Sequence, residues 1–114
     1  MELRNEQFLY LTTIGRKSGK SHEIEIWFVI REGRFYVLAE YPNSNWVKNI
    51  RQNPRIKVRV GTLRFEGSGR VLDEQQDSAL WREAQQLSRE KYKWGDGVPV
   101  ELTPASPLSD KDLR

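Results

Sequence analysis

The sequence contains no cysteine, only one histidine and no long hydrophobic segment. Without cysteine the chain can form neither a disulfide bond nor a thiolate-ligated metal site. A single histidine makes a histidine-based metal centre equally unfavourable. No apolar stretch approaches the roughly 18 residues of a membrane-spanning helix, and the first residues lack a signal-peptide pattern. We therefore expect a soluble, cytoplasmic protein with no metal and no integral membrane segment.

The length and composition indicate one small folded domain. The 114 residues suffice for a single core but not for two. Hydrophobic residues make up 37% of the chain and the mean hydropathy is −0.75, yet the apolar residues form periodic runs, which argues against disorder. The net charge of +3 and the pI of about 9.3 favour anionic ligands without requiring nucleic acid.

The first two-thirds of the chain are predicted to be mainly β-structure. Residues 22–31 alternate in polarity, and one face of this segment consists of Ile24, Ile26, Phe28 and Ile30. The turn residues that follow at 32–34 predict a hairpin over residues 22–39. Further strands are expected at residues 8–14, 55–60 and 63–72, and in the last of these Gly67 and Gly69 indicate a bulge or a sharp bend.

Two helices and an irregular tail complete the predicted fold. A short helix begins after Asn43 or Ser44 as N-cap and ends at Asn53, because a residue before proline is disfavoured in a helix. A longer helix is predicted from Asp73 to about Lys93. The glycines and prolines beyond it predict an irregular tail. We expect a mainly β, α+β fold: a small antiparallel barrel with flanking helices, with residues 1–94 as one domain and 95–114 as the tail.

Residues 11–20, LTTIGRKSGK, form the most informative segment of the sequence. A β-prone run ends at Gly15, and two cations, a hydroxyl and a second glycine follow before the next strand. Arg16 offers a planar fork and Lys17 a point charge, the two cationic ways of holding a phosphate or a carboxylate. Glycine lets a ligand approach the backbone closely. The segment predicts an anion-binding turn; the alternative is an ordinary solvated hairpin tip.

Several sequence blocks together resemble a known family. These blocks are residues 11–20, residues 24–29 (IEIWFV), residues 45–61 (NWVKNIRQNPRIKVRVG), Phe65-Glu66-Gly67 and Lys91-Tyr92. Together they resemble the deazaflavin-dependent nitroreductase family, a branch of the split β-barrel flavin and deazaflavin oxidoreductases, over about residues 8–94. The resemblance implies a split barrel of the flavin-reductase or FMN-binding type that binds coenzyme F-420. It also implies hydride transfer from the reduced deazaflavin to an electron-poor organic acceptor such as a quinone, a nitroaromatic or an activated alkene.

The same resemblance implies a set of cofactor-binding residues. Three match the family positions that hold the cofactor's phosphate or acidic tail: Arg16, Lys17 and Ser18. Two match positions beside the ring system and the ribityl chain: Thr12 and Thr13. Two match a tryptophan and an asparagine of the short helix that borders the cofactor: Trp46 and Asn49.

Two positions depart from the family pattern, and one more residue is a candidate for the acceptor. His22 stands where the family often has arginine, and we count it among the cofactor-binding residues. Residues 40–43, which begin with Glu40, replace a loop that is often Ser-Lys-Gly-Gly, and a glutamate near a phosphate would repel it. Tyr92 is the candidate acceptor contact, and Trp94 could line the same pocket. Both residues could instead fasten the long helix to the barrel.

Other functions remain open at the level of the sequence. An FMN-dependent oxidoreductase on the same barrel would use the same cationic turn for the FMN phosphate. A non-enzymatic small barrel could bind another ligand, or nucleic acid through Arg55, Lys57 and Arg59, although Glu23 and Glu66 interrupt the positive face. We therefore expect a small-molecule cofactor and an organic acceptor as ligands, and no nucleic acid. Apolar residues on both faces of the chain around Trp27 favour a homodimer.

Overall fold

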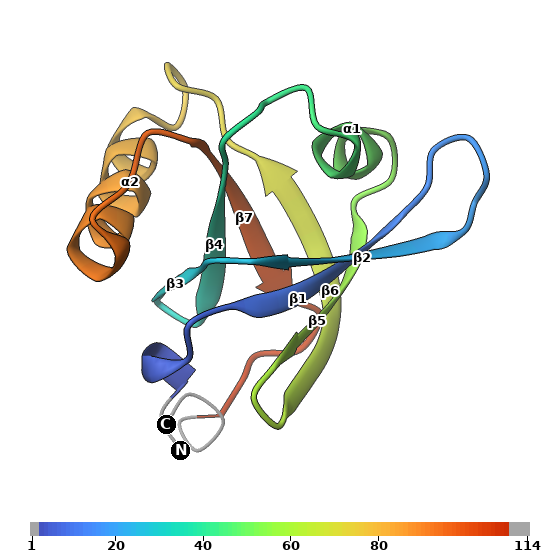
Figure 1. Ribbon diagram of the computed structural model, residues 1–114, viewed down its shortest axis with the longest axis horizontal. Coiled ribbons are helices and arrows are strands. Elements are labelled where there is room, and N and C mark those ends of the chain that lie inside the picture. The colour runs from blue at the N-terminus through green and yellow to red at the C-terminus, as the bar shows by residue number, and fades with distance from the viewer. Residues whose placement is uncertain (1–2, 110–114) are drawn as a thin grey trace.

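The computed structural model describes residues 3–109, which form one seven-stranded sheet, two α-helices and a short 3-10 helix (Figure 1). The elements in chain order are η1 (Leu3–Asn5), β1 (Leu9–Ile14), β2 (Ser21–Ile26), β3 (Val29–Arg31), β4 (Arg34–Ala39), α1 (Asn45–Gln52), β5 (Arg55–Val60), β6 (Leu63–Val71), α2 (Ser78–Tyr92) and β7 (Val98–Pro104). The strand order is β2-β1-β5-β6-β7-β4-β3, and neighbouring strands are antiparallel. This arrangement confirms the predicted mainly β fold with flanking helices.

The two edge strands of the sheet, β2 and β3, follow each other directly in the chain. Only Trp27 and Phe28 separate Ile26, the last residue of β2, from Val29, the first residue of β3. Three Cα–Cα steps span at most about 11 Å, so the two edges must lie close together and the sheet must curl. The described sheet has no ladder between β2 and β3. The barrel is therefore split at this corner.

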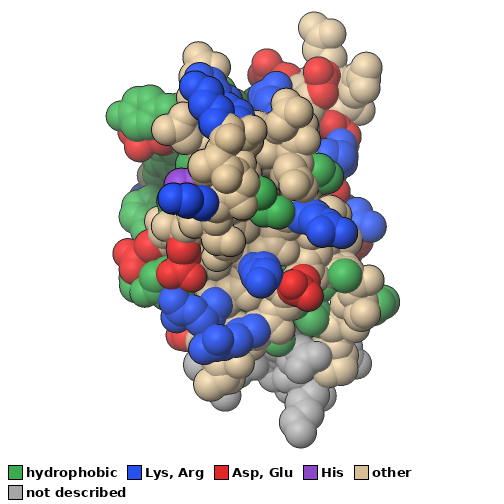
Figure 2. Space-filling view, turned by 90° about the vertical axis from the view of Figure 1, so that its right-hand side faces the viewer, with side chains coloured by type: hydrophobic (Ala, Val, Ile, Leu, Met, Phe, Trp, Pro, Cys, Tyr) green, Lys and Arg blue, Asp and Glu red, His purple; other side chains and the backbone are tan. Residues whose placement is uncertain are grey.

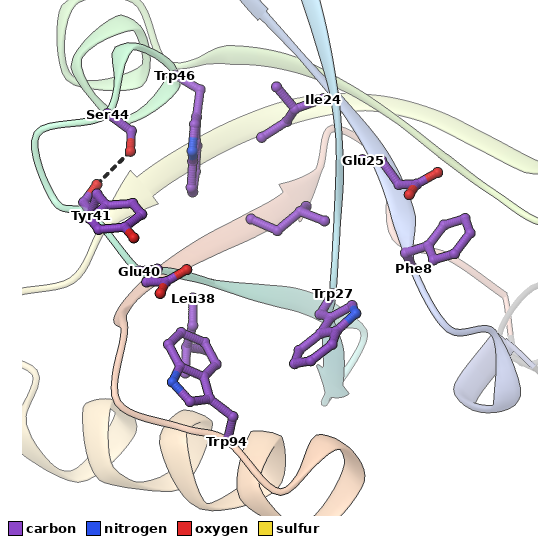
Figure 3. Close-up of a pocket in the computed structure, with 11 residues that line it drawn as sticks. Phe8, Ile24, Glu25, Trp27, Leu38, Glu40, Tyr41, Ser44, Trp46 and Trp94 are labelled. Carbon is purple, nitrogen blue, oxygen red and sulfur yellow. Dashed lines mark hydrogen bonds between the residues drawn. The ribbon is translucent and has the colours of Figure 1, made fainter.

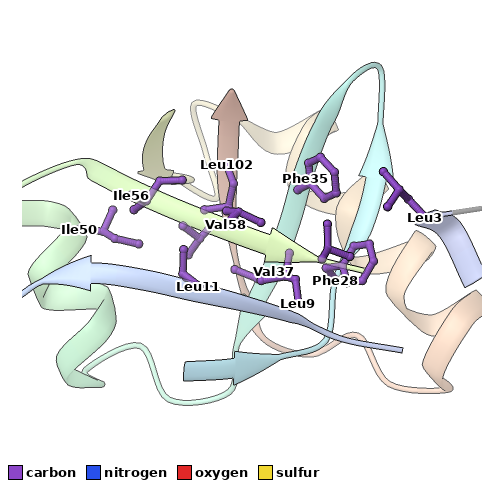
Figure 4. Close-up of a cluster of buried hydrophobic side chains, with 12 residues drawn as sticks. Leu3, Leu9, Leu11, Phe28, Phe35, Val37, Ile50, Ile56, Val58 and Leu102 are labelled. Carbon is purple, nitrogen blue, oxygen red and sulfur yellow. The ribbon is translucent and has the colours of Figure 1, made fainter. Parts of the chain in front are cut away.

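Inward-facing side chains of the strands fill the barrel (Figure 4). The fully buried residues of β1, β4, β5 and β7 include Leu9, Leu11, Phe35, Val37, Val58, Val60, Val100 and Leu102. The residues predicted to share one face of the segment 22–31 all belong to this cluster or pack against it: Ile24, Ile26, Phe28 and Ile30. The predicted face is thus confirmed, because alternate residues of a strand point to the same side.

The prediction of one continuous strand over residues 22–31 is wrong. The chain turns a corner at Trp27 and Phe28, so that β2 pairs with β1 and β3 pairs with β4. The hairpin is confined to β3 and β4, whose turn residues Glu32 and Gly33 have positive φ angles of 50° and 76°, as a two-residue hairpin turn requires. Side-chain alternation continues through the corner, so periodicity alone could not reveal it.

The predicted irregular tail is wrong for Val98–Pro104, which form strand β7. This strand pairs with β6 on one side and β4 on the other, so it joins the two halves of the sheet. Pro99 and Pro104 lie close to its ends, where a missing N–H is tolerated. Between them the buried Val100 and Leu102 alternate with Glu101. Residues 110–114 of the predicted tail lie outside the described residues.

The glycines of β6 lie where this strand changes partners. β6 pairs with β5 up to Ser68 and with β7 from Gly67 onward, and both ladders keep a one-to-one register. No extra residue is inserted, so the strand curves without the predicted bulge (Figure 1). A Cβ at Gly67 would lie only 2.0 Å from the carbonyl oxygen of Thr103. The close approach of β7 therefore requires glycine at this position.

The two helices cover different parts of the barrel. Helix α1 ends at Gln52, before Asn53 and Pro54, as predicted, and buries Val47 and Ile50. Helix α2 contacts β3, β4 and β7 from outside the barrel (Figure 1). Its Ala84 packs with Val29 and Tyr36.

Helix α2 begins at Ser78, five residues later than predicted. The carboxylate of Asp73 accepts hydrogen bonds from the backbone N–H groups of Gln75 and Gln76, at 2.9 and 2.8 Å. Such local side-chain bonds favour a turn over a helix. No helix among the described residues has the length and apolar character needed to cross a bilayer.

Candidate functional site

A pocket of about 690 Å³ opens between β2, the start of α1 and the loop that follows α2 and contains Trp94 (Figure 3). Five aromatic side chains from different segments line it: Phe8, Trp27, Tyr41, Trp46 and Trp94. Ile24 and Ile26 of β2 and Leu38 of β4 add apolar surface. The volume lies within the range of about 300–1,000 Å³ that is usual for ligand sites. Flat aromatic and aliphatic walls of this kind suit a planar ring system.

The elements around the pocket explain why these side chains meet. Ile24 and Ile26 face the same side of β2 because strand side chains alternate. Trp46 lies in the first turn of α1 and points into the pocket opposite Tyr41 (Figure 3). Trp27 sits at the corner between β2 and β3, and this residue is 42% exposed. The corner that splits the barrel therefore also supplies one wall of the pocket.

The β1–β2 turn, residues 15–20, projects from the barrel on the side away from α2 (Figure 1). Two backbone hydrogen bonds of 2.8 Å shape it: the N–H of Gly15 donates to the carbonyl of Lys20, and the N–H of Gly19 donates to the carbonyl of Gly15. Gly19 has a φ of 72°, which favours glycine. Lys17 and Ser18 are exposed at the tip, and the Ser18 hydroxyl accepts a hydrogen bond from the Lys20 N–H at 3.2 Å.

Arg16 is held against α1 by a group of hydrogen bonds. Its Nη1 donates to Oδ1 of Asn49 at 2.9 Å, and its backbone N–H donates to the same oxygen at 3.2 Å. Its Nη2 donates to Oδ1 of Asn45 at 3.3 Å. Nδ2 of Asn49 donates in turn to the hydroxyl of Thr13 at 3.2 Å. Asn49 and Thr13 are 4% and 0% exposed, so they orient the turn from inside the protein.

His22 lies against Gly15 at the base of the same turn. A Cβ at Gly15 would be 2.8 Å from Nε2 of His22 and 2.8 Å from the hydroxyl oxygen of Ser18. The absence of a side chain at Gly15 thus lets the imidazole and the hydroxyl come together. His22 also lies on the same face of β2 as Ile24 and Ile26. Because Ile24 and Ile26 line the pocket, this face of the strand connects the turn with the pocket.

Thr12 lies apart from the other sequence-predicted residues. It follows the buried Leu11 in β1 and faces the opposite side from Thr13. Its neighbours there are Lys57 and Glu66, on the outer face of β5 and β6. Thr12 shares a second pocket on this face with Gly19 of the turn, but not with Trp46 or His22.

Tyr92, the candidate acceptor contact, lies behind a wall of the pocket. Its ring stacks on Trp27, with a centroid distance of 4.5 Å and an interplanar angle of 3°. Its hydroxyl accepts a hydrogen bond from the N–H of Phe28 at 3.1 Å and donates one to the carbonyl of Gln7 at 2.6 Å. Burial raises the pKa of Tyr92 to about 12. These contacts favour a packing role for Tyr92, whereas Trp94 lines the pocket.

Lys91 helps Tyr92 to hold the corner between β2 and β3. Its ammonium group donates to the carbonyls of Glu6 and Phe28, at 2.8 and 3.1 Å, and lies 3.9 Å from the centroid of the Phe28 ring. Burial lowers the pKa of Lys91 to about 8. The last turn of α2 therefore positions Trp27 through the backbone of Phe28.

Basic residues elsewhere on the surface are largely matched by acidic ones. Figure 2 shows Lys and Arg side chains mixed with Asp and Glu across one face of the molecule. Arg59 pairs with Glu23 at 3.4 Å and lies 4.0 Å from the ring centroid of Tyr10, and Lys57 pairs with Glu66 at 3.8 Å. These ion pairs interrupt the row of positive charges on β5 that would have to contact the phosphates of a nucleic acid.

Sequence reasoning missed several parts of the pocket. Leu38 comes from a segment without a recognisable motif, and Tyr41 belongs to the segment 40–43 that departs from the family pattern. Ile24 and Ile26 lie in the family block 24–29, but their positions in the strand indicate core residues. The aromatic residues were visible in the sequence, but they are separated by up to 86 positions, from Phe8 to Trp94. Only the corner and the loop that follows α2 bring Trp27 and Trp94 together, at a centroid distance of 6.5 Å.

The fold and the site together define a split barrel of the flavin and deazaflavin oxidoreductase type. Residues 1–102 match the family described as “F420H(2)-dependent quinone reductase”. The chain belongs to this family. It is therefore an oxidoreductase that depends on the deazaflavin coenzyme F-420, as the resemblance implied.

Solved structures share the same fold. An F420-H2 dependent reductase (FDR-A) is 23% identical with a TM-score of 0.63, over 84% of this chain and 92% of that chain. A domain-swapped dimer is 25% identical with a TM-score of 0.61, over 84% of this chain and 78% of that chain. HutZ, a heme storage protein from Vibrio cholerae, is 16% identical with a TM-score of 0.75, over 94% of this chain and 87% of that chain.

The described residues fit a cofactor with a planar ring and an anionic tail. The pocket offers flat walls of sufficient size, and no Lys or Arg lines it. The turn provides exposed cations, Lys17 and Lys20, together with backbone groups and a hydroxyl. Apolar and cationic surfaces are thus separated in space, as such a cofactor requires.

Proposed function

We propose that this F-420-dependent reductase acts on a planar, electron-poor acceptor, namely a quinone, a nitroaromatic or an activated alkene. The observation that carries the proposal is the aromatic pocket beside the cationic turn. The family supports a quinone as the first compound to test. When bound, the reduced coenzyme supplies a hydride, and one proton from solvent completes the conversion of a quinone to a hydroquinone.

In this proposal each group of residues has a separate task. Lys17, Ser18 and His22 bind the phosphate or the acidic tail, and Arg16 holds the turn in place through Asn49. Trp46 and the other aromatic walls orient the ring and exclude water. Trp27 and Trp94 border the space for the acceptor. Thr13 acts indirectly, by orienting Asn49.

The direct test measures oxidation of reduced coenzyme F-420 by menadione, a neutral naphthoquinone, in the presence of the purified protein. We expect turnover that depends on both compounds. A parallel titration with FMN, read by flavin fluorescence, tests the alternative cofactor, since the same turn could hold the FMN phosphate. Tight FMN binding without binding of F-420 would contradict the proposal.

Variants of the turn test its role in cofactor binding. We expect Lys17→Ala to weaken F-420 binding about tenfold, because it removes one charged donor. Arg16→Ala should weaken it at least as much, because it also releases the turn from α1. Fluorescence titration gives both dissociation constants, and an unchanged affinity in both variants would remove the turn from the site.

We further propose that the protein forms a homodimer in the cytoplasm. Phe8, Trp27 and Tyr41 are the large apolar residues most exposed in the described chain, and all three also line the aromatic pocket, so the second copy would lie against its rim. A structural relative is a domain-swapped dimer. Exposed aromatic groups of this kind are typical of interaction surfaces. Light scattering on the eluting peak of a size-exclusion column measures the mass directly, and a monomer at all concentrations would contradict the dimer. The cytoplasmic location stays a prediction.

A further inference from the structure

One exposed, charged side chain lines the aromatic pocket without a polar partner among the described residues. Glu40 follows the last residue of β4, and Figure 3 shows its carboxylate between Tyr41, Leu38 and Trp94. No hydrogen bond or ion pair holds this carboxylate within residues 3–109. Nothing in the described structure therefore neutralises its negative charge.

A second carboxylate, that of Glu25, also lines the pocket. Oε1 of Glu25 accepts a hydrogen bond from the hydroxyl of Tyr10 at 2.9 Å, which raises the pKa of that tyrosine. Figure 3 shows Glu25 pointing away from Trp46 and Trp94, on the other side of β2. Glu25 keeps its negative charge in this hydrogen bond, but Glu40 is the carboxylate that faces Tyr41 and Trp94.

The positive groups lie in a different part of the molecule. Lys17 and Lys20 are on the β1–β2 turn, and no Lys or Arg lines the pocket. The faces of tryptophan and tyrosine rings attract cations, and a carboxylate at the same place adds to this attraction. Aromatic rings around an uncompensated carboxylate form a binding site for an aromatic cation.

We propose that the acceptor end of the pocket selects planar aromatic acceptors that carry a positive charge, and disfavours those that carry a carboxylate. This inference rests on the proposed function, because it assumes that the acceptor occupies this pocket. Glu40 is the residue that sets the charge preference. Tyr41 and Trp94 face the same charged group of the acceptor.

The test compares three naphthoquinones that differ only at the end of a propyl chain. The terminal group is trimethylammonium in one, methyl in the second and carboxylate in the third, so the spacer keeps the quinone potential the same. With reduced F-420 and low salt, we expect kcat/KM for the cation to exceed that for the anion about tenfold. Salt at 0.5 M should reduce this ratio, since screening weakens interactions between exposed charges.

Variants of Glu40 test whether this residue sets the preference for positively charged acceptors. Glu40→Gln should lower the cation-to-anion ratio about fivefold, and Glu40→Lys should reverse it. Glu74→Gln is the matched control, because it removes the same charge from an exposed turn that lines no part of the pocket. Its ratio should equal that of the wild type.

A binding measurement separates this inference from the proposed function. The three naphthoquinones are titrated into protein without coenzyme, and tryptophan fluorescence gives the affinities. Turnover with all three at equal kcat/KM, or a ratio unchanged in Glu40→Gln, would overturn the charge preference and leave the reductase intact. If none is reduced, the proposed acceptor class fails, and the fluorescence titration alone then decides whether Glu40 selects cations.

Discussion

Asn49 connects helix α1 to the cationic turn. It accepts two hydrogen bonds from Arg16 and donates one to Thr13, although it is only 4% exposed. A buried amide that makes three hydrogen bonds stabilises the fold and fixes the position of its partners. The resemblance implied that Asn49 borders the cofactor. The structure shows that its buried amide also holds the turn in place through two hydrogen bonds from Arg16.

We expect Asn49→Ala to lower the free energy of unfolding by about 1–3 kcal/mol, because it leaves the buried hydroxyl of Thr13 and the N–H of Arg16 without their partner. Urea denaturation measures this difference. Lys48→Ala is the control, since Lys48 is exposed in the same helix, and its effect should stay within about 0.5 kcal/mol. Equal stabilities of the two variants would contradict the role of Asn49.

Lys91 predicts a pH dependence of stability. Its pKa is about 8 in the folded protein, against 10.5 for an ordinary lysine, so between these values the unfolded chain binds more protons than the folded one. The free energy of unfolding then rises with pH in this window. Wild type should therefore gain stability relative to Lys91→Met as the pH increases from 8 to 9.5. Denaturation curves of both proteins at pH 7, 8, 9 and 9.5 test this, and a constant difference would contradict the lowered pKa.

Strand β7 is the element that joins the two halves of the sheet. It lies between β6 and β4, and its Val100 and Leu102 are fully buried. On the opposite face, Glu101 accepts a hydrogen bond from the hydroxyl of Tyr36 at 2.9 Å and pairs with Arg34 and Arg70 at 3.4 Å. A strand with partners on both sides and buried side chains contributes far more to stability than a tail does.

Leu102→Ala should therefore lower the free energy of unfolding by about 2–4 kcal/mol, because a buried leucine leaves a cavity in the core. Val98→Ala in the same strand is the control, since Val98 is only partly buried, and it should cost about 1 kcal/mol or less. Denaturant unfolding compares the two. Two equally small effects would mean that residues 98–104 do not form a central strand in solution.

Across the whole molecule, charge is divided between two ends of the site. The exposed cations of the turn lie at one end, and the aromatic pocket with Glu40 lies at the other. The net charge of +3 adds only a weak general attraction for anions. The position of the charges should therefore matter more than their sum.

Cofactor affinity should fall when salt increases from 20 mM to 0.5 M, because the screening length shrinks from about 20 Å to about 4 Å. Lys17→Gln should weaken F-420 binding at low salt and approach the wild type at high salt. Lys57→Gln changes the net charge equally, but on the outer face of β5, so it should have little effect. A loss of affinity as large in Lys57→Gln as in Lys17→Gln would show that only net charge matters.

The sequence by itself determined the class of fold, the inward residues of most strands, helix α1 and the cationic turn. These features depend on side chains a few positions apart, and alternation, turn residues and prolines act over that range. The family blocks added the cofactor, because each block is a local pattern and their combination is specific to the family.

Only the tertiary structure decided how these elements meet. Arg16 and Asn49, which are hydrogen-bonded, are 33 positions apart in the sequence. The hydroxyl of Tyr92 donates a hydrogen bond to the carbonyl of Gln7, which lies 85 positions earlier. The break at Trp27 and the central place of β7 follow from which strands pair, and local periodicity carries no information about pairing across such separations. The aromatic pocket and the free carboxylate of Glu40 exist because the curled sheet brings both of its edges to one corner.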